Sequence, residues 1–207
     1  DDDDTINLGL GQRWILNDGK VIAGLNLFYD NEWDAGHERV SVGGEVLSSV
    51  GDFRVNSYSA LSDTETVNGA EETALDGMDM ELAVPLPYLP NTRVHAKSFK
   101  WDGENGGNDL EGDTISLRTA LPMGFEFEAG STSYENNAAN DADFVSISFN
   151  VARFHQQKYV QQPQLTSNKA YELIDITGRR FEKVRRSNQI VKQNASGQAM
   201  QLTFTGI

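Results

Sequence analysis

The sequence contains no cysteine and only three histidines, His37, His95 and His155. The absence of cysteine excludes disulfides, thiolate metal sites and cysteine nucleophiles. The histidines are far apart in the sequence and have no HExxH or similar spacing, and no GxSxG, phosphate-loop or dinucleotide-binding motif is present. We therefore expect no catalytic site, no bound metal and no cofactor.

Long apolar runs are also missing. No stretch approaches the roughly 18 to 20 consecutive apolar residues of a membrane-spanning helix, which excludes a helical membrane protein. The hydrophobic fraction of 38% and the mean hydropathy of −0.48 resemble those of a soluble protein. A membrane β-barrel, however, is apolar only at alternate positions, so its average hydropathy hides the membrane-facing band. The order of the residues must therefore decide between the two.

Basic residues are scarce in the first three-quarters of the 207 residues. Up to Val151 there are 28 acidic and 8 basic residues, and from Ala152 onward there are 3 and 9, so that net charges of −20 and +6 combine to the total of −14. This balance argues against nucleic acid as a partner, because a phosphate-binding surface needs clustered Lys and Arg. The chain has an acidic body and a basic tail.

Apolar residues alternate with polar ones through most of the acidic body, which is the period of a β-strand with two different faces. Between Thr5 and Trp14, for example, Ile6, Leu8 and Leu10 alternate with polar residues and glycine. We expect about nine such strands. Their alternating sets fall within residues 5–14, 21–29, 39–46, 53–56, 78–84, 93–97, 115–121, 125–129 and 145–151.

The connections between these strands alternate between short and long. The short ones are Asn17 to Lys20, Ser48 to Asp52, Pro85 to Asn91 and Leu121 to Gly124. The long ones contain no Lys or Arg and are Asp30 to Glu38, Ser62 to Gly77, Asp102 to Asp113 and Glu135 to Asp143. In an up-and-down meander all long loops lie at one end, as in outer-membrane barrels with periplasmic turns and extracellular loops.

Aromatic residues near strand ends suggest an interfacial girdle. They are Trp14, Trp33, Tyr88, Trp101, Tyr134 and Phe144.

Charged residues occupy the face opposite the apolar one. In a packed soluble core they would be very costly, whereas in a hydrated lumen they are ordinary. The sequence therefore predicts an all-β fold, a transmembrane antiparallel up-and-down outer-membrane β-barrel. Its predicted lumen-facing residues are Arg13, Arg39, Glu45, Arg54, Asp79, Glu81, Arg93, Lys97, Arg118, Glu126 and Glu128.

The alternation stops after Val151. Residues 156–164 are polar and Gln-rich, Ser167 to Asp175 and Arg179 to Arg186 are expected to form short helical turns interrupted by Gly178, and Gln201 to Thr205 is strand-like. We divide the chain into barrel strands at 1–151, a helical or polar segment at 152–187 and a linker at 188–207.

The basic tail has two interpretations. Its cations are a solvated face, or they lie in the pore and pair with lumenal carboxylates, which holds the linker in register. The candidate contacts of this plug are Arg179, Arg180, Lys183, Arg185, Arg186 and Lys192, and their candidate partners are Glu45, Asp79, Glu81, Glu126 and Glu128.

The acidic loop Asp102 to Asp113 offers several carboxylates but lacks the spacing of an EF-hand loop. We interpret it as a solvated surface loop. A weaker hypothesis is that divalent cations bridge such loops to lipopolysaccharide phosphates.

Five strings, taken together and in order, resemble conserved-looking blocks of the intimin/invasin-type inverse autotransporters (type Ve secretion). They are LGLGQRW at Leu8 to Trp14, LFYD at Leu27 to Asp30, GHERVSVGGE at Gly36 to Glu45, DGMDMELAVPLPYLP at Asp76 to Pro90, and RRSNQIV at Arg185 to Val191. The resemblance spans most of the chain.

The resemblance implies a twelve-stranded barrel, a periplasmic helical segment, and a linker that runs through the pore to a C-terminal adhesive passenger. It implies as partners the outer-membrane lipid and lipopolysaccharide, the barrel-assembly machinery, periplasmic chaperones, and a host or surface receptor reached through the passenger. Nine strands depart from this twelve-stranded pattern, because about three leading strands are expected to be missing. An open sheet would leave unpaired edges that lipid cannot satisfy, so either the chain is a fragment or a partner segment closes the sheet. The alternatives are an open porin-like channel and a soluble antiparallel β-sandwich.

Overall fold

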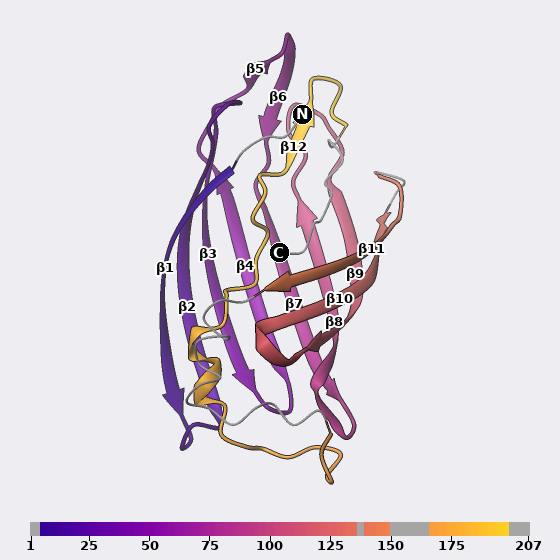
Figure 1. Ribbon diagram of the computed structural model, residues 1–207. Coiled ribbons are helices and arrows are strands. Elements are labelled where there is room, and N and C mark those ends of the chain that lie inside the picture. Colours follow the sequence, from indigo (N-terminus) through magenta and orange to yellow (C-terminus); the bar gives the residue numbers. More distant parts are fainter. Residues whose placement is uncertain (1–4, 136–138, 150–165, 199–207) are drawn as a thin grey trace.

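The computed structural model describes residues 5–135, 139–149 and 166–198. Nine strands form one antiparallel sheet in which each strand pairs with the next along the chain, except that β4 pairs with β7 (Figure 1). These strands are β1 (Thr5–Leu16), β2 (Val21–Glu32), β3 (His37–Ser48), β4 (Asp52–Ala60), β7 (Gly77–Leu86), β8 (Leu89–Trp101), β9 (Leu110–Ala120), β10 (Phe125–Tyr134) and β11 (Ala142–Phe149). The predicted up-and-down meander and its nine strands are confirmed.

The apolar face of the sheet is exposed, and the polar face is buried. Leu10 is 80% exposed and Ile147 is 72% exposed, while Arg39 and Asp30 are fully buried. Among the described residues, more polar and charged residues than hydrophobic ones are buried, which is the reverse of a soluble domain. A sheet of this kind needs an apolar solvent outside, as the strands of a membrane barrel have.

In the part of the chain that the structure describes, no helix is long and apolar enough to cross a membrane, a finding that has no bearing on strands.

The sheet is curved but not closed. Within the described residues β1 and β11 are its two edges, and the remaining strands lie between them in order. Figure 1 shows the sheet bent around the C-terminal part of the chain, which runs along the concave face.

A second, smaller sheet lies at the long-loop end and was not predicted. Its strands are β5 (Glu65–Val67), β6 (Ala70–Ala74) and β12 (Lys192–Asn194), in the order β12-β6-β5. The hairpin of β5 and β6 turns at Asn68 and Gly69, both with positive φ, a conformation that Asn and Gly adopt readily. These strands are too short to show a period of two in the sequence.

The expected helical turns were only partly right. The described part of the C-terminal region contains one 3₁₀ helix, η3 (Thr177–Phe181), and a second, η1 (Pro122–Gly124), lies in a short turn of the sheet. Ser167 to Asp175 is not helical, and Gly178 lies inside η3 instead of interrupting a helix. Residues 156–164 and 201–205 lie outside the described residues.

The aromatic residues divide between the two faces. Trp14, Trp33 and Tyr88 are exposed, as an interfacial girdle requires. Trp101 is buried and packs against Tyr58 on the concave side, with 4.9 Å between the ring centroids, so the expectation of a girdle position was wrong for it. Trp101 does lie at the end of a strand, but its position in the alternation of β8 directs its side chain to the concave face.

Candidate functional site

Residues 166–198, called the tail segment below, follow the concave face from the short turns to the long loops (Figure 1). At the short-turn end its backbone is hydrogen-bonded to the turns of three different hairpins. These contacts are Ser167 N–H to Tyr88 O at 2.9 Å, Tyr88 N–H to Ala170 O at 3.3 Å, Ser49 Oγ to Glu172 O at 2.7 Å, Ile174 N–H to Ser49 Oγ at 3.0 Å, and Ile176 N–H to Gly19 O at 2.8 Å. Because these bonds use its backbone, Ser167 to Asp175 is not helical where helical turns were expected.

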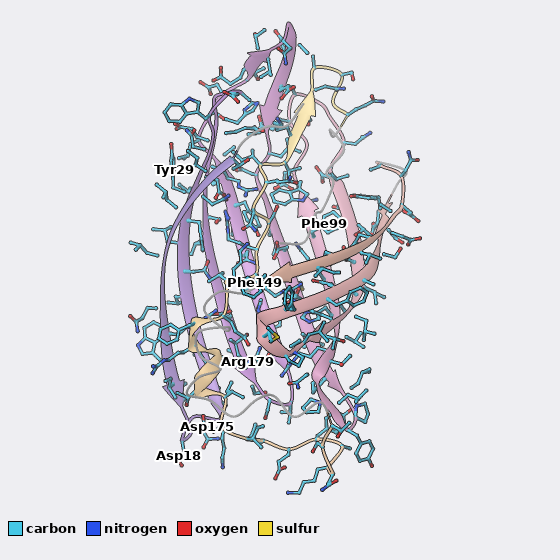
Figure 2. All side chains as sticks on the ribbon, viewed as in Figure 1. Asp18, Tyr29, Phe99, Phe149, Asp175 and Arg179 are labelled. Atoms are coloured by element: carbon cyan, nitrogen blue, oxygen red, sulfur yellow. The ribbon has the colours of Figure 1, made fainter. Side chains whose placement is uncertain are left out.

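An ion pair between the tail segment and the sheet joins η3 to the start of β4. Both terminal nitrogens of Arg179 donate to the Asp52 carboxylate, at 2.9 Å (Nη1 to Oδ1) and 2.7 Å (Nη2 to Oδ2). Arg179 also donates to Ser48 O at 2.9 Å. Figure 2 shows Arg179 at the short-turn end of the sheet, where Asp175 and Asp18 also lie. A two-point contact of this kind fixes orientation as well as distance.

Asp52 is shared by three arginines. Besides Arg179, Arg54 Nη2 lies 3.2 Å from Oδ2 and Arg93 Nη1 lies 3.3 Å from Oδ1. The side chain of Asp52 is 1% exposed. A buried carboxylate is tolerated only when cations and hydrogen bonds compensate for its lost hydration, and here the tail segment supplies one of those cations.

Arg13 of β1 holds the end of η3. Its Nη1 donates to the carbonyl oxygens of Arg180 at 2.9 Å and Glu182 at 2.6 Å, while its Nε donates to Glu45 at 2.5 Å. The last carbonyls of a helix have no partner within the helix. The Arg13 guanidinium therefore caps η3 and ties it to two strands.

Arg185 lies in the middle of the concave face. Its Nη2 is 3.0 Å from Glu81 Oε2 and 3.4 Å from Glu128 Oε1. Glu81 also accepts from Arg54 at 2.9 Å, and His95 Nδ1 lies 3.2 Å from it. Arg185 thus bridges carboxylates of two strands that are not neighbours, β7 and β10.

Arg186 and Arg39 meet at Asp30. Arg39 Nη2 is 2.8 Å from Asp30 Oδ2, and Arg186 Nη2 contacts the same oxygen. Arg39 also donates to two tail carbonyls, Ser187 O and Gln189 O, each at 2.8 Å. The sheet therefore binds both side chains and backbone of the tail segment here.

A small apolar cluster lies next to these ion pairs. Val191 of the tail segment is fully buried among Tyr58, Leu75, Phe99, Trp101 and Leu110. The Tyr58 hydroxyl donates to Asp79 at 2.7 Å and accepts from Ser187 N–H at 2.7 Å. Apolar packing and polar contacts thus fix the same stretch of the tail segment.

At the long-loop end the tail segment becomes a strand. β12 pairs antiparallel with β6, with Lys192 opposite Ala74. Lys192 Nζ lies 3.0 Å from Glu32 and 3.1 Å from Glu72. The Gln193 side chain donates to Glu104 O at 2.8 Å and accepts from Glu104 N–H at 3.1 Å. β12 therefore joins two long loops.

These contacts shift the pKa values of titratable groups outside the strands. Burial opposes the charge of Arg179, but Glu182 and Asp52 outweigh it and raise the pKa of that guanidinium above its usual value. Hydrogen bonds from Thr177 lower the pKa of the Asp175 carboxyl. Arg179 and Asp175 are therefore held in their charged forms at neutral pH.

The predicted plug cations differ in what they contact. Arg179, Arg185, Arg186 and Lys192 form ion pairs with the sheet or its loops. Arg180 is exposed, and its guanidinium lies 4.6 Å from the ring centroid of Phe181. Lys183 is exposed as well.

The predicted carboxylate partners differ in what they contact. Glu81 and Glu128 contact the tail segment through Arg185. The other three pair within the sheet: Glu45 with Arg13 and Arg54, Asp79 with Lys97, and Glu126 with Arg118.

Four carboxylates that contact the tail segment were not among the candidates. They are Asp30, Glu32, Asp52 and Glu72. The sequence places all of them at predicted strand ends or in loops, where an acidic residue is usually a solvated one. Alternate residues of a strand share a face, so the sequence did place Asp30 on the polar face with Asn26 and Asp52 on the polar face with Arg54.

Within the described residues, no group of three or more His, Asp or Glu side chains is arranged to hold a metal ion. His37 lies near Glu72, and His95 lies near Glu81. His155 lies outside the described residues.

These features define a class: an up-and-down sheet of the transmembrane-barrel type, with its own C-terminal tail segment bound along the concave face. Comparison with known protein families agrees with this class. The family described as inverse autotransporter, beta-domain, matches residues 1–188. The chain belongs to this family, and its membership implies a place in the outer membrane.

The chain is also similar to proteins named intimin and invasin. The chain is 26% identical over 202 residues to an intimin of Escherichia coli O111:H-, covering 90% of this chain and 20% of that protein. It is 28% identical over 131 residues to an invasin of Yersinia enterocolitica, covering 58% of this chain and 15% of that protein. The chain thus spans about a fifth of the length of the intimins it matches.

A solved structure from work on the in-meso crystallization of membrane proteins has the same fold. Its TM-score is 0.72 at 20% identity, covering 92% of this chain and 80% of that one. Neither the family description nor these names indicate an enzyme.

Proposed function

We propose that this chain is the outer-membrane anchor and translocator of a surface-displayed protein. In this proposal the sheet is buried in lipid and the tail segment crosses the membrane on the concave side, leading to a C-terminal adhesin or invasin passenger. One observation carries the proposal: the tail segment is bound by the sheet at both ends, by Asp52 at the short turns and by Glu32 and Glu72 at the long loops.

The two faces of the sheet fit their proposed surroundings. The exposed apolar residues, such as Leu10 and Ile147, face lipid. The eleven charged residues predicted from the sequence line the lumen, where they pair with one another, with the tail segment or, as Arg93 does, with Asp52. The short turns are periplasmic and the acidic long loops are extracellular, as in outer-membrane barrels generally.

The division of the chain follows from this path. Residues 1–151 supply barrel strands, 152–187 lie on the periplasmic side and enter the lumen, and 188–207 form the linker towards the passenger. The proposed partners are outer-membrane lipid and lipopolysaccharide, the barrel-assembly machinery, periplasmic chaperones, the passenger, and a receptor that the passenger binds.

Two other functions fit the structure less well. An open porin-like channel needs a free lumen, but the tail segment contacts carboxylates along the concave face from Asp52 to Glu72. A soluble β-sandwich needs a second sheet over the apolar face, and among the described residues that face is exposed.

Membrane fractionation tests the proposal. The full-length protein should be found in the outer membrane, migrate in a heat-modifiable way in detergent gels, and present the part that follows this chain to protease added to intact cells. Recovery from the aqueous phase without detergent would support the sandwich. A heat-modifiable barrel with a high, steady conductance in its native form would support the porin.

A further inference from the structure

Several glycines of the sheet lie directly opposite aromatic residues, and at two of them, Gly9 and Gly77, a Cβ would approach the opposite ring most closely. Gly9 of β1 is the register partner of Phe28 in β2, and Gly77 of β7 is the partner of Trp101 in β8. A Cβ on Gly9 would lie 2.2 Å from the Phe28 ring, and one on Gly77 would lie 2.3 Å from the Trp101 ring. Each ring therefore lies across a glycine of the neighbouring strand, in space that any side chain would fill.

Each ring also lies beneath an arginine that binds the tail segment. The Arg186 guanidinium carbon is 4.3 Å from the Phe28 ring centroid. The Arg39 guanidinium carbon is 5.8 Å from that of Trp101 and 4.7 Å from that of Tyr58. Cations are attracted to the faces of aromatic rings, and more strongly when water is excluded, as it is here because both arginines are buried.

These two arginines hold one short stretch of the tail segment. Arg186 belongs to it and contacts Asp30, and Arg39 binds the carbonyls of Ser187 and Gln189. The chain of contacts therefore runs from glycine to ring, from ring to arginine, and from arginine to the tail segment.

We propose that Gly9 and Gly77 are positioning residues for the tail segment, which seat the Phe28 and Trp101 rings under Arg186 and Arg39 and so fix residues 186–189 against the sheet. This inference rests on the proposed function, in which that stretch is the part of the linker held in the lumen. Glycine has no side chain with which to contact the tail segment, so the two aromatic rings transmit the effect of Gly9 and Gly77.

Gly9 is the better position for a test. Its backbone is outside the positive-φ region, so alanine introduces a Cβ without backbone strain. Alanine at Gly77 would also meet the Lys100 carbonyl at 2.6 Å, which would disturb the strand itself. Gly11 supplies a matched control on the same strand, because a Cβ there would meet nothing closer than 3.6 Å.

This chain has no cysteine, so a thiol introduced into it is unique within these 207 residues. Ser187 is 6% exposed, whereas Ser196 is exposed. In outer membranes that contain the full-length protein, a maleimide should modify the Ser187→Cys variant slowly and the Ser196→Cys variant quickly. The rate at position 187 then reports release of the tail segment, and heat-modifiable migration reports whether the barrel is intact.

Adding Gly9→Ala to the Ser187→Cys variant should raise the modification rate roughly tenfold, the size expected when a desolvated cation–π contact is lost. Gly11→Ala should leave the rate unchanged. Phe28→Leu, which removes the ring and keeps the glycine, should raise it as Gly9→Ala does. In an Arg186→Gln background, Gly9→Ala should add nothing, because the contact through which it acts is already absent.

An unchanged rate in Gly9→Ala, or an equal increase in the presence and absence of Arg186, would overturn the inference. If Gly9→Ala does not assemble, an unchanged rate in Phe28→Leu would overturn it instead. If the Ser187→Cys variant is modified as fast as the Ser196→Cys variant before any further change, the proposed path of the tail segment is wrong.

Discussion

Asp52 and Arg179, 127 positions apart in the sequence, form a two-point ion pair with distances of 2.9 and 2.7 Å. Asp52 lies at the start of β4, directly after a short turn, and Arg179 lies in η3 of the tail segment. The pair fixes the tail segment at the point where it meets the concave face. Because Arg54 and Arg93 share the same carboxylate, Asp52 also balances the charge of the sheet itself.

Asp52→Asn should therefore destabilise the protein strongly. The change removes the anion that Arg54, Arg93 and Arg179 share, and removing one partner of a buried ion pair costs about 3 to 5 kcal/mol of unfolding free energy. Denaturant unfolding in detergent or vesicles measures this loss.

Asp18→Asn is the matched control, because Asp18 is an exposed turn residue with φ of 52°, which asparagine also tolerates. Equal stability of the two variants would contradict the role of Asp52.

Reversing the charge of Arg185 and Arg186 together should release the tail segment from the lumen. Arg185 faces Glu81 and Glu128, and Arg186 faces Asp30, so glutamate at these positions turns attraction into repulsion. Conductance of the full-length protein in planar bilayers should rise, and display of the passenger should fall. Arg180→Glu should change neither, because Arg180 is exposed. Unchanged conductance together with unchanged display in the double variant would disprove the plug contacts.

Leu27→Arg and Leu61→Arg should differ in their effect on stability, although the two leucines are 57% and 54% exposed. Leu27 lies in the middle of β2 on the face assigned to lipid, where arginine costs about 2 to 4 kcal/mol. Leu61 follows β4 at the long-loop end, where a surface substitution changes stability by about 0.5 kcal/mol or less. Unfolding in lipid vesicles compares them. Two equally harmless substitutions would mean that water, and not lipid, covers the outer face.

Gln193→Ala should loosen the long loop between β8 and β9. The amide of Gln193 makes two hydrogen bonds to the backbone of Glu104, and each such bond contributes about 1 kcal/mol. Cleavage after Glu104 by a glutamate-specific protease should become roughly thirtyfold faster, because the loss of both bonds favours the open loop. Gln198→Ala, at an exposed position of the same segment, should not change the rate. Cleavage at the same rate in both variants would refute the contact.

The strands were predictable because each carries its own signal. Leu25 and Leu27 alternate with Gly24 and Asn26 within β2, so the two faces can be read without knowing the neighbours. Which residue pairs with which depends on sheet register and on the path of the tail segment. The sequence could therefore predict that Glu81 faces the lumen, but not that Glu81 meets Arg185 while Glu45 meets Arg13.

The errors share a cause, which is that tertiary contacts override local pattern. Ser167 to Asp175 has residues that could form helical turns, yet the short turns bind its backbone through Tyr88 and Ser49. β12 has only three residues and forms because β6 offers an edge next to it. No local pattern could show either partner.

The central claim is that the tail segment crosses the outer membrane from the short-turn side to the long-loop side. Single thiols at its two ends test this directly, since the chain has no cysteine of its own. Lys169 and Ser196 are both exposed. On intact cells a membrane-impermeant maleimide should modify the Ser196→Cys variant and spare the Lys169→Cys variant, which should react only after the outer membrane is opened. Modification of both variants, or of Lys169→Cys alone, on intact cells would contradict the account.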